Sequence, residues 1–125
     1  MMDDMSSIHD FAPGDFLIFQ LEAGFALLRV LDVQLMNGEA VWHIAAYRNF
    51  FLDTETADAA LDEPQNLGIE IAHAALTNRA FESTQVAKMR NVPLTGDELA
   101  AYEAWKWATE PRVSDRSVRL LLGLR

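Results

Sequence analysis

Cysteine is absent from the 125 residues of this chain. That absence excludes a disulfide framework, a thiolate nucleophile and any zinc site that depends on cysteine ligands. Long hydrophobic runs are also absent, because stretches such as 120–124 are far shorter than the roughly 20 residues that cross a membrane. The first residues, Met-Met-Asp-Asp-Met, are acidic where a secretion signal is basic. We therefore expect a cytoplasmic protein with no membrane partner.

Signatures of catalysis and of cofactor binding are equally scarce. The six glycines lie singly along the chain, so none of them belongs to a glycine-rich phosphate loop. The three histidines do not follow an HxH or HExxH spacing, and the sequence has no Gly-x-Ser-x-Gly nucleophile elbow. We therefore expect no cofactor, no metal site and no enzymatic activity.

Basic residues are few in the first half of the chain. The whole sequence has a net charge of −9, and residues 1–63 hold twelve acids against two arginines, a net charge of −10. Such a surface repels phosphate backbones, which argues against a nucleic-acid partner, and it attracts a basic protein. The simpler interpretation is that acidic charge keeps a small protein soluble.

The strongest structural signal is Asn37-Gly38, which separates the β-rich runs 25–36 and 39–47. Asn-Gly between such runs predicts a two-residue hairpin turn, because a type I′ turn needs positive φ at both central residues. Counting outward from this turn fixes the register of the two strands. The pairs predicted on the apolar, core-facing side are Leu35 with Ala40, Val33 with Trp42, and Leu31 with Ile44.

Further strands are predicted at 16–19, 69–76 and 85–92. The early connections are too short for a crossover helix, so we expect antiparallel neighbours. The predicted fold is mainly β (α+β), a small bent antiparallel sheet or partly open barrel of five to six strands with one helix packed on it. The expected organisation is a single domain over 1–125, with a loose leader at 1–10 and an Arg-rich tail at 112–125. For that tail, a strand, a helix against the core and a partly disordered end remain open.

An acidic segment without any basic residue follows the third predicted strand. Two turns of helix over 54–61 are compatible with it, with Asp53 or Thr54 as the cap and Pro64 as the breaker. The spacing of the acids does not follow a calcium-binding loop. We therefore predict a solvent-facing surface that binds a basic partner. Its acids are Asp53, Glu55, Asp58, Asp62 and Glu63.

A second helix is predicted from a capping box at Thr95-Gly-Asp-Glu98. In this motif the Thr95 hydroxyl and the Glu98 carboxylate each accept a hydrogen bond from the other residue's amide. The helix should continue to about Thr109. Trp105 and Trp107 lie about 200° apart around it, so at least one of them must point away from the sheet. The candidate is Trp107, either as an exposed interface anchor or covered by the Arg-rich tail.

Two histidines, His43 and His73, lie on predicted strands and can approach each other in a barrel. In the predicted hairpin register His43 lies across from Asp32, which makes these two residues a candidate polar pair. A structural His–Asp contact, a metal site and the base of a nucleophilic triad are all compatible with such a pair. We favour the structural contact, because the sequence offers neither a metal-ligand spacing nor an activated nucleophile.

Several short motifs are spread over residues 14–107. A Gly-Asp turn at Gly14-Asp15 begins one strand, and Gly24-Phe25 begins another that ends in Arg29-Val-Leu. Further stretches lie at 43–47, 71–81 and 93–105. Together these motifs resemble the SH3-like-barrel immunity proteins of bacterial polymorphic-toxin systems and their uncharacterised relatives. The resemblance implies an SH3-like barrel and, for the immunity proteins, the neutralisation of a toxin domain made by the same cell. It assigns no catalytic residue.

Three hypotheses about function follow from these observations. The first is a non-enzymatic protein-binding domain whose acidic half meets a basic partner, with an immunity protein as the particular case. The second is a small enzyme or ligand-binding barrel with a site around His43 and Asp32. The third is a self-associating domain, a homo-oligomer formed through the tryptophan-containing helix or the apolar tail.

Overall fold

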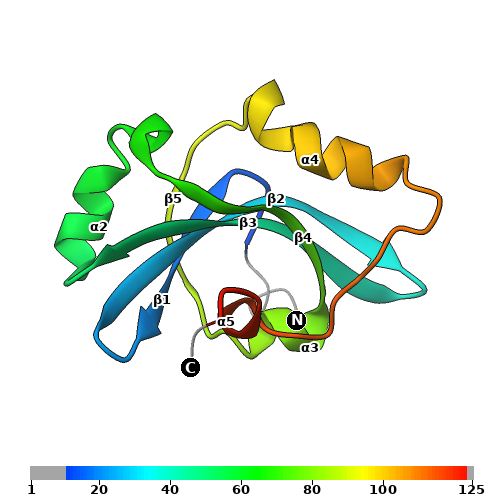
Figure 1. Ribbon diagram of the computed structural model, residues 1–125, viewed down its shortest axis with the longest axis horizontal. Helices are drawn as coiled ribbons and strands as arrows, with labels where there is room; N and C mark the ends of the chain where they lie inside the picture. The colour runs from blue at the N-terminus through cyan, green and yellow to red at the C-terminus, as the bar shows by residue number, and fades with distance from the viewer. Residues whose placement is uncertain (1–10, 124–125) are drawn as a thin grey trace, which may run out of the picture.

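The computed structural model describes residues 11–123, so the predicted leader at 1–10 lies outside the described residues. One bent sheet of five strands runs through the molecule, with short helices above and below it (Figure 1). The strands are β1 (Asp15–Leu21), β2 (Gly24–Met36), β3 (Glu39–Phe51), β4 (Ile69–Thr77) and β5 (Ala87–Asn91). The helices are α2 (Thr54–Ala60), the 3-10 turn η1 (Pro64–Asn66), α3 (Asn78–Glu82), α4 (Gly96–Lys106) and α5 (Val118–Leu121).

The strands follow the order β4-β3-β2-β1-β5, and every neighbouring pair is antiparallel. Strands β1 to β3 form a meander joined by tight turns, β4 returns beside β3, and β5 adds to the other edge beside β1. The sheet is open, because β4 and β5 form its two edges. The prediction of a mainly β (α+β) fold with a bent antiparallel sheet and a helix packed on it is therefore confirmed.

Helices cover both faces of the sheet (Figure 1). On one face α3 and α5 pack over the largest core cluster, in which the rings of Trp42 and Phe81 stack with 4.0 Å between their centroids. On the other face α2 covers a cluster around Phe16, and α4 covers a smaller one beneath Tyr102. Each short helix thus gains its stability by burying apolar side chains against the sheet.

The β2–β3 hairpin keeps the predicted register from the Asn37–Gly38 turn through the pair Asp32 and His43. A bulge at Leu31 then shifts the ladder by one residue, so that Val30, and not Leu31, pairs with Ile44. The extra residue moves the Leu31 side chain to the opposite face, where it packs in the cluster beneath α4. The prediction that Leu31 belongs to the Val33 face is therefore wrong.

Leu35 also departs from the predicted core. It does pair with Ala40, but it lies beside the hairpin turn and its residue is 80% exposed. The alternating pattern correctly places Leu35 on one side of the strand. It does not show whether a helix covers that position, and at the hairpin tip the core cluster of this face does not reach Leu35.

The capping box at Thr95 and Glu98 is present, and α4 begins at Gly96 as predicted. The helix ends at Lys106, three residues earlier than expected. After it, the chain turns back so that the Trp105 ring N–H donates to the Arg112 carbonyl oxygen at 2.8 Å.

The described part of the Arg-rich tail combines two of the three possibilities left open by the sequence. Ser114 forms a single parallel bridge with Leu76 at the β4 edge. Ser117 then caps the short helix α5, whose Val118 is buried in the main core. Among residues 11–123, no helix is long and apolar enough to cross a membrane.

Candidate functional site

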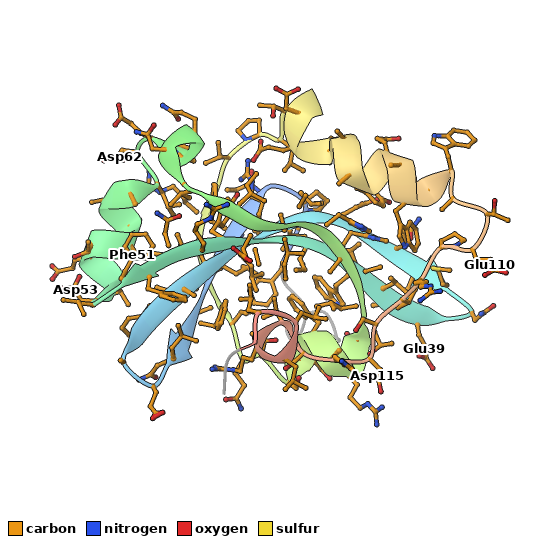
Figure 2. All side chains as sticks on the ribbon, in the orientation of Figure 1. Glu39, Phe51, Asp53, Asp62, Glu110 and Asp115 are labelled. Atoms are coloured by element: carbon orange, nitrogen blue, oxygen red, sulfur yellow. The ribbon has the colours of Figure 1, made fainter. Side chains whose placement is uncertain are left out.

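The five acids predicted to form a binding surface lie together on α2 and the turn that follows it. All five are exposed. Figure 2 labels Asp53 and Asp62 at one end of the molecule, with Glu39 and Glu110 at the opposite end. Helix α4 runs toward that opposite end, so Trp107, its C-cap residue, does not join the acidic surface. We refer to the segment from Asp53 to Glu63 as the acidic surface.

Four of these acids also form local contacts, one of which is the hydrogen bond that Glu63 accepts from the Asn66 side-chain amide at 3.3 Å. Asp53 is the N-cap of α2, and its Oδ1 accepts from the amide and the hydroxyl of Thr56, both at 2.7 Å. These hydrogen bonds hold the pKa of Asp53 below its usual value. Arg90 of β5 donates to Asp58 at 2.9 Å and to Asp62 at 3.1 Å, which raises the pKa of its guanidinium.

The acidic surface remains strongly negative after these contacts are counted. Its five carboxylates are met by the single guanidinium of Arg90, which leaves a net charge of −4. Among residues 11–123, Glu55 and Glu63 do not contact Arg90, their side chains do not cap a helix, and the Glu63 carboxylate accepts only from the Asn66 side-chain amide. These two carboxylates are therefore the ones best placed to meet a partner's cation.

An exposed apolar residue borders the acidic surface. Leu52, which directly precedes Asp53, is 86% exposed, whereas the exposed Phe50 pairs with Ala26 on the other face of the sheet from α2. A groove of about 370 Å³ lies between the end of α2, η1 and β3, with Phe51 and Leu67 among its walls and Asp62 at its rim. Negative charge beside exposed apolar area is typical of a surface that contacts another protein.

The other candidate anchor, Trp107, is 85% exposed. Trp105 instead packs against the cluster beneath α4. The prediction that at least one of the two tryptophans points away from the sheet is confirmed.

The candidate polar pair is adjacent in the β2–β3 ladder, but its side chains bond to other residues. The Asp32 carboxylate accepts from the Tyr102 hydroxyl at 2.5 Å and from the Val33 amide at 2.8 Å. His43 is fully buried, and its Nε2 lies 2.7 Å from the Gln34 Oε1. Asp32 and His43 are therefore neighbours in the ladder, as predicted, but their side chains form hydrogen bonds with other residues and not with each other.

The second ring nitrogen of His43, Nδ1, lies 2.9 Å from Nε2 of His73. Because the Gln34 Oε1 is an acceptor, His43 Nε2 must carry a proton, and its Nδ1 must then accept from the His73 Nε2–H. The two rings therefore form a directed chain from His73 through His43 to Gln34. Tyr102 and Trp105 of α4 pack against the His43 ring, at centroid distances of 4.3 and 4.7 Å.

Both histidines are neutral at pH 7. Burial lowers the pKa of His43 to about 4, with the charges of His73 and Lys106 acting in the same direction and that of Asp32 against them. Burial also lowers the pKa of His73 to about 4. Within residues 11–123, no group of three or more His, Asp or Glu side chains is arranged to hold a metal ion. Both ring nitrogens of His43 are engaged within this cluster.

Sequence reasoning missed the partners Gln34 and Tyr102, and also the buried Arg29, whose guanidinium binds Glu98. Gln34 could have been found, because in the predicted ladder it pairs with Val41, two pairs from His43 and on the same face of the hairpin. The pairing of Arg29 with Glu98 left no sequence signal beyond the capping box, because it depends on where α4 crosses the sheet.

These features define a small α+β domain with an open antiparallel sheet, an acidic surface at one end and a buried histidine cluster under α4. Comparison with protein-family models, with curated proteins and with solved structures finds no match to this chain. The resemblance to immunity proteins therefore stays a prediction.

Proposed function

We propose that this chain is a non-enzymatic protein-binding domain that uses its acidic surface to hold a basic protein. The observation that carries the proposal is the combination of a net charge of −4 on that surface with the exposed side chain of Leu52 at its border and the apolar groove walls of Phe51 and Leu67. The charge would speed the approach of a basic partner, and the apolar residues would supply buried contact area.

The particular role that we propose is that of an immunity protein, an SH3-like barrel that neutralises a basic toxin domain in the cytoplasm. This role rests on the motif resemblance together with the acidic surface. It requires a neighbouring reading frame that encodes a toxin with a basic C-terminal domain. A genome without such a frame would exclude the immunity role.

A catalytic site around His43 and Asp32 has weaker support. His43 has no exposed surface, and both of its ring nitrogens are engaged by Gln34 and His73. A substrate could not reach this imidazole without opening α4. We therefore do not propose an enzymatic activity.

The binding proposal can be tested with the basic domain encoded beside the gene, by measuring its dissociation constant at several salt concentrations. We expect the affinity to fall as salt rises, because exposed charge pairs are screened. The double variant Glu55→Lys, Glu63→Lys should weaken binding by more than tenfold. The matched control is Glu39→Lys, Glu110→Lys, which makes the same charge change at the opposite end of the molecule.

A second pair of variants tests the contribution of exposed apolar area to binding. Leu52→Ser should weaken binding about tenfold, whereas Leu35→Ser, at a position of nearly equal exposure near the hairpin tip, should leave it unchanged. Equal effects of the two leucine variants and of the two charge variants would refute the acidic surface as the binding site.

A further inference from the structure

A cavity on the α4 side of the sheet lies apart from the contacts proposed above. It has two adjoining lobes with volumes of about 170 Å³ and 420 Å³. The inner lobe lies between the sheet and α4, and the outer lobe opens between η1 and the loop that precedes α4. The residues that line both lobes are Arg29, Tyr47, Ile69, Asp97 and Glu98.

Tyr47 gives this cavity a polar group without a partner. The residue is 4% exposed and lines both lobes. Within residues 11–123, no residue forms a hydrogen bond with its hydroxyl, and the hydroxyl is not among the fully buried unpaired atoms, so it opens onto the cavity. Burial raises the pKa of Tyr47 to about 12, with Arg29 acting against the rise and Glu98 adding to it. The phenol is therefore neutral at pH 7 and can accept a hydrogen bond.

The charged groups around Tyr47 leave one carboxylate free. Arg29 donates to Glu98 at 3.1 and 3.2 Å and to the Gly14 and Pro93 carbonyl oxygens, so four of its five N–H groups are engaged. This pair neutralises itself. Asp97 is exposed at the rim of both lobes, and no residue of the described chain donates to its carboxylate.

The walls beside these groups are apolar. Leu31 belongs to the inner lobe, Leu67 and Val92 belong to the outer lobe, and Ile69 is common to both. An anion in this cavity would meet Asp97 and would compete with Glu98 for Arg29. At the start of α4 the Glu98 carboxylate already accepts from the Thr95 amide, and Asp97 places a second negative charge in the same turn, which repels an anion. A cation with an aliphatic chain would instead be attracted by the Asp97 carboxylate, and its chain would contact the apolar walls.

We propose that this cavity binds a primary alkylammonium group. Its alkyl chain would lie against Ile69 and the other apolar walls, and its ammonium would donate to the Asp97 carboxylate and the Tyr47 hydroxyl. The group can be supplied by a free small amine or by a lysine side chain of another protein. The proposal does not depend on the acidic surface, since neither Asp97 nor Tyr47 belongs to it.

The test is a titration of the full-length, ¹⁵N-labelled protein with pentylamine, followed by amide chemical shifts. We expect saturable shifts centred on Tyr47, Ile69 and Asp97, and no such shifts with pentan-1-ol, which lacks the charge. Tyr47→Phe, which keeps the ring, and Asp97→Asn should each weaken binding about tenfold, as expected for the loss of a charge-assisted hydrogen bond. The charge-matched control, Glu55→Gln, should change the affinity less than twofold.

A second titration distinguishes a free amine from a lysine side chain as the source of the ammonium group. Its ligand is Nα-acetyl-lysine methylamide, and the norleucine analogue, which lacks the charge, is the control. Binding of the lysine amide as tight as that of pentylamine would assign the cavity to a lysine side chain, and binding of pentylamine alone would assign it to a free amine. The proposal is overturned if pentan-1-ol binds as tightly as pentylamine. It is also overturned if Asp97→Asn, a variant at an exposed position, behaves like Glu55→Gln.

Discussion

Arg29 and Glu98 are 69 residues apart in the sequence, and their side chains join the sheet to the start of α4. The Arg29 guanidinium donates to both carboxylate oxygens of Glu98, at 3.1 and 3.2 Å, and it lies 4.1 Å from the centre of the Phe16 ring. The same carboxylate accepts from the Thr95 amide at 2.9 Å. One side chain therefore completes the helix cap and neutralises a buried cation.

We expect Glu98→Ala to lower the free energy of unfolding by about 3 kcal/mol, because it leaves the Arg29 charge buried without its partner. Asp97→Ala removes a neighbouring acid from the same helical turn and should cost less than about 1 kcal/mol. Urea denaturation at pH 7 measures both. Equal losses would show that Glu98 acts only as a helix-cap residue.

The Glu98 pair also predicts a pH dependence. Burial acts to raise the pKa of Glu98, but hydrogen bonds from Arg29 and the Thr95 amide outweigh it and leave the pKa below its ordinary 4.5. Since the folded-state pKa is depressed, the stabilisation is present above pH 4.5 and is lost as the pH falls through the folded-state pKa. The difference between wild type and Glu98→Ala should therefore shrink in acid.

Local signals predicted the elements of this fold well. Asn37-Gly38 fixed the turn and the five pairs next to it, and Thr95 with Glu98 fixed the start of α4. The bulge at Leu31 could not be predicted, because its apolar neighbours satisfy either face of the strand equally well. Only helices on both faces make an extra residue at this position favourable, and their packing is a tertiary property.

The neutral histidine pair predicts a loss of stability at mildly acidic pH. The pKa values of His43 and His73 in the folded protein are about 4, below their ordinary 6.5, so the unfolded chain binds more protons between these values. Stability should therefore be full above pH 6.5 and fall as the pH drops toward 4. Between pH 7.5 and 5 we expect each histidine to contribute a loss on the order of 2 kcal/mol, so about 4 kcal/mol for the pair, in urea denaturation.

A variant separates this effect from the titration of carboxylates. His73→Gln removes one titrating ring and keeps a side-chain amide that can donate to the His43 Nδ1. Its stability should change less than that of wild type between pH 7.5 and 5. An unchanged pH dependence in this variant would assign the acid sensitivity to other groups. Nitrogen chemical shifts at pH 7 should in addition report Nε2-protonated rings for both histidines.

The Tyr102 hydroxyl provides a further prediction, because it donates to Asp32 at 2.5 Å. Burial raises the pKa of Tyr102, and the hydrogen bond to Asp32 raises it further, so the phenol is a donor throughout the neutral range. Tyr102→Phe should lower the free energy of unfolding by about 1.5–2 kcal/mol, as expected for a hydrogen bond to a charged group. Tyr47→Phe is the matched control and should change it by less than about 0.5 kcal/mol. A Tyr102→Phe effect as small as that of the control would contradict this assignment.

The candidate site was also predictable only where it depends on residues that are close together in the sequence. Acids close together in sequence must lie close together on a short helix, so the acidic surface followed from residues 53–63 alone. The contacts of Asp32 and His43 depend on Tyr102 and His73, which come from distant segments. A register places two strands beside each other, but it does not choose which of several polar side chains completes each hydrogen bond.

Gly14 and Gly38 allow backbone strain and close packing to be separated, since both have positive φ, +94° and +81°. A Cβ on Gly38 would meet nothing within 4 Å, so Gly38→Ala should cost about 1 kcal/mol from its backbone conformation alone. A Cβ on Gly14 would lie 2.8 Å from the Val92 carbonyl oxygen. The Gly14 carbonyl oxygen also accepts from the Arg29 guanidinium at 2.5 Å and from the Val92 amide at 3.0 Å, so any shift of its backbone disturbs both the end of β5, which Val92 directly follows, and the buried arginine.

Gly14→Ala should therefore destabilise the protein by at least about 2 kcal/mol more than Gly38→Ala in parallel urea titrations. A double variant, Gly14→Ala with Glu98→Ala, tests whether the two sites are coupled. Because both substitutions disturb Arg29, we expect their joint cost to be smaller than the sum of the single costs. Additive costs would show that the Gly14 turn and the Arg29–Glu98 pair stabilise the fold independently, and that the turn requires glycine only for its contact with β5.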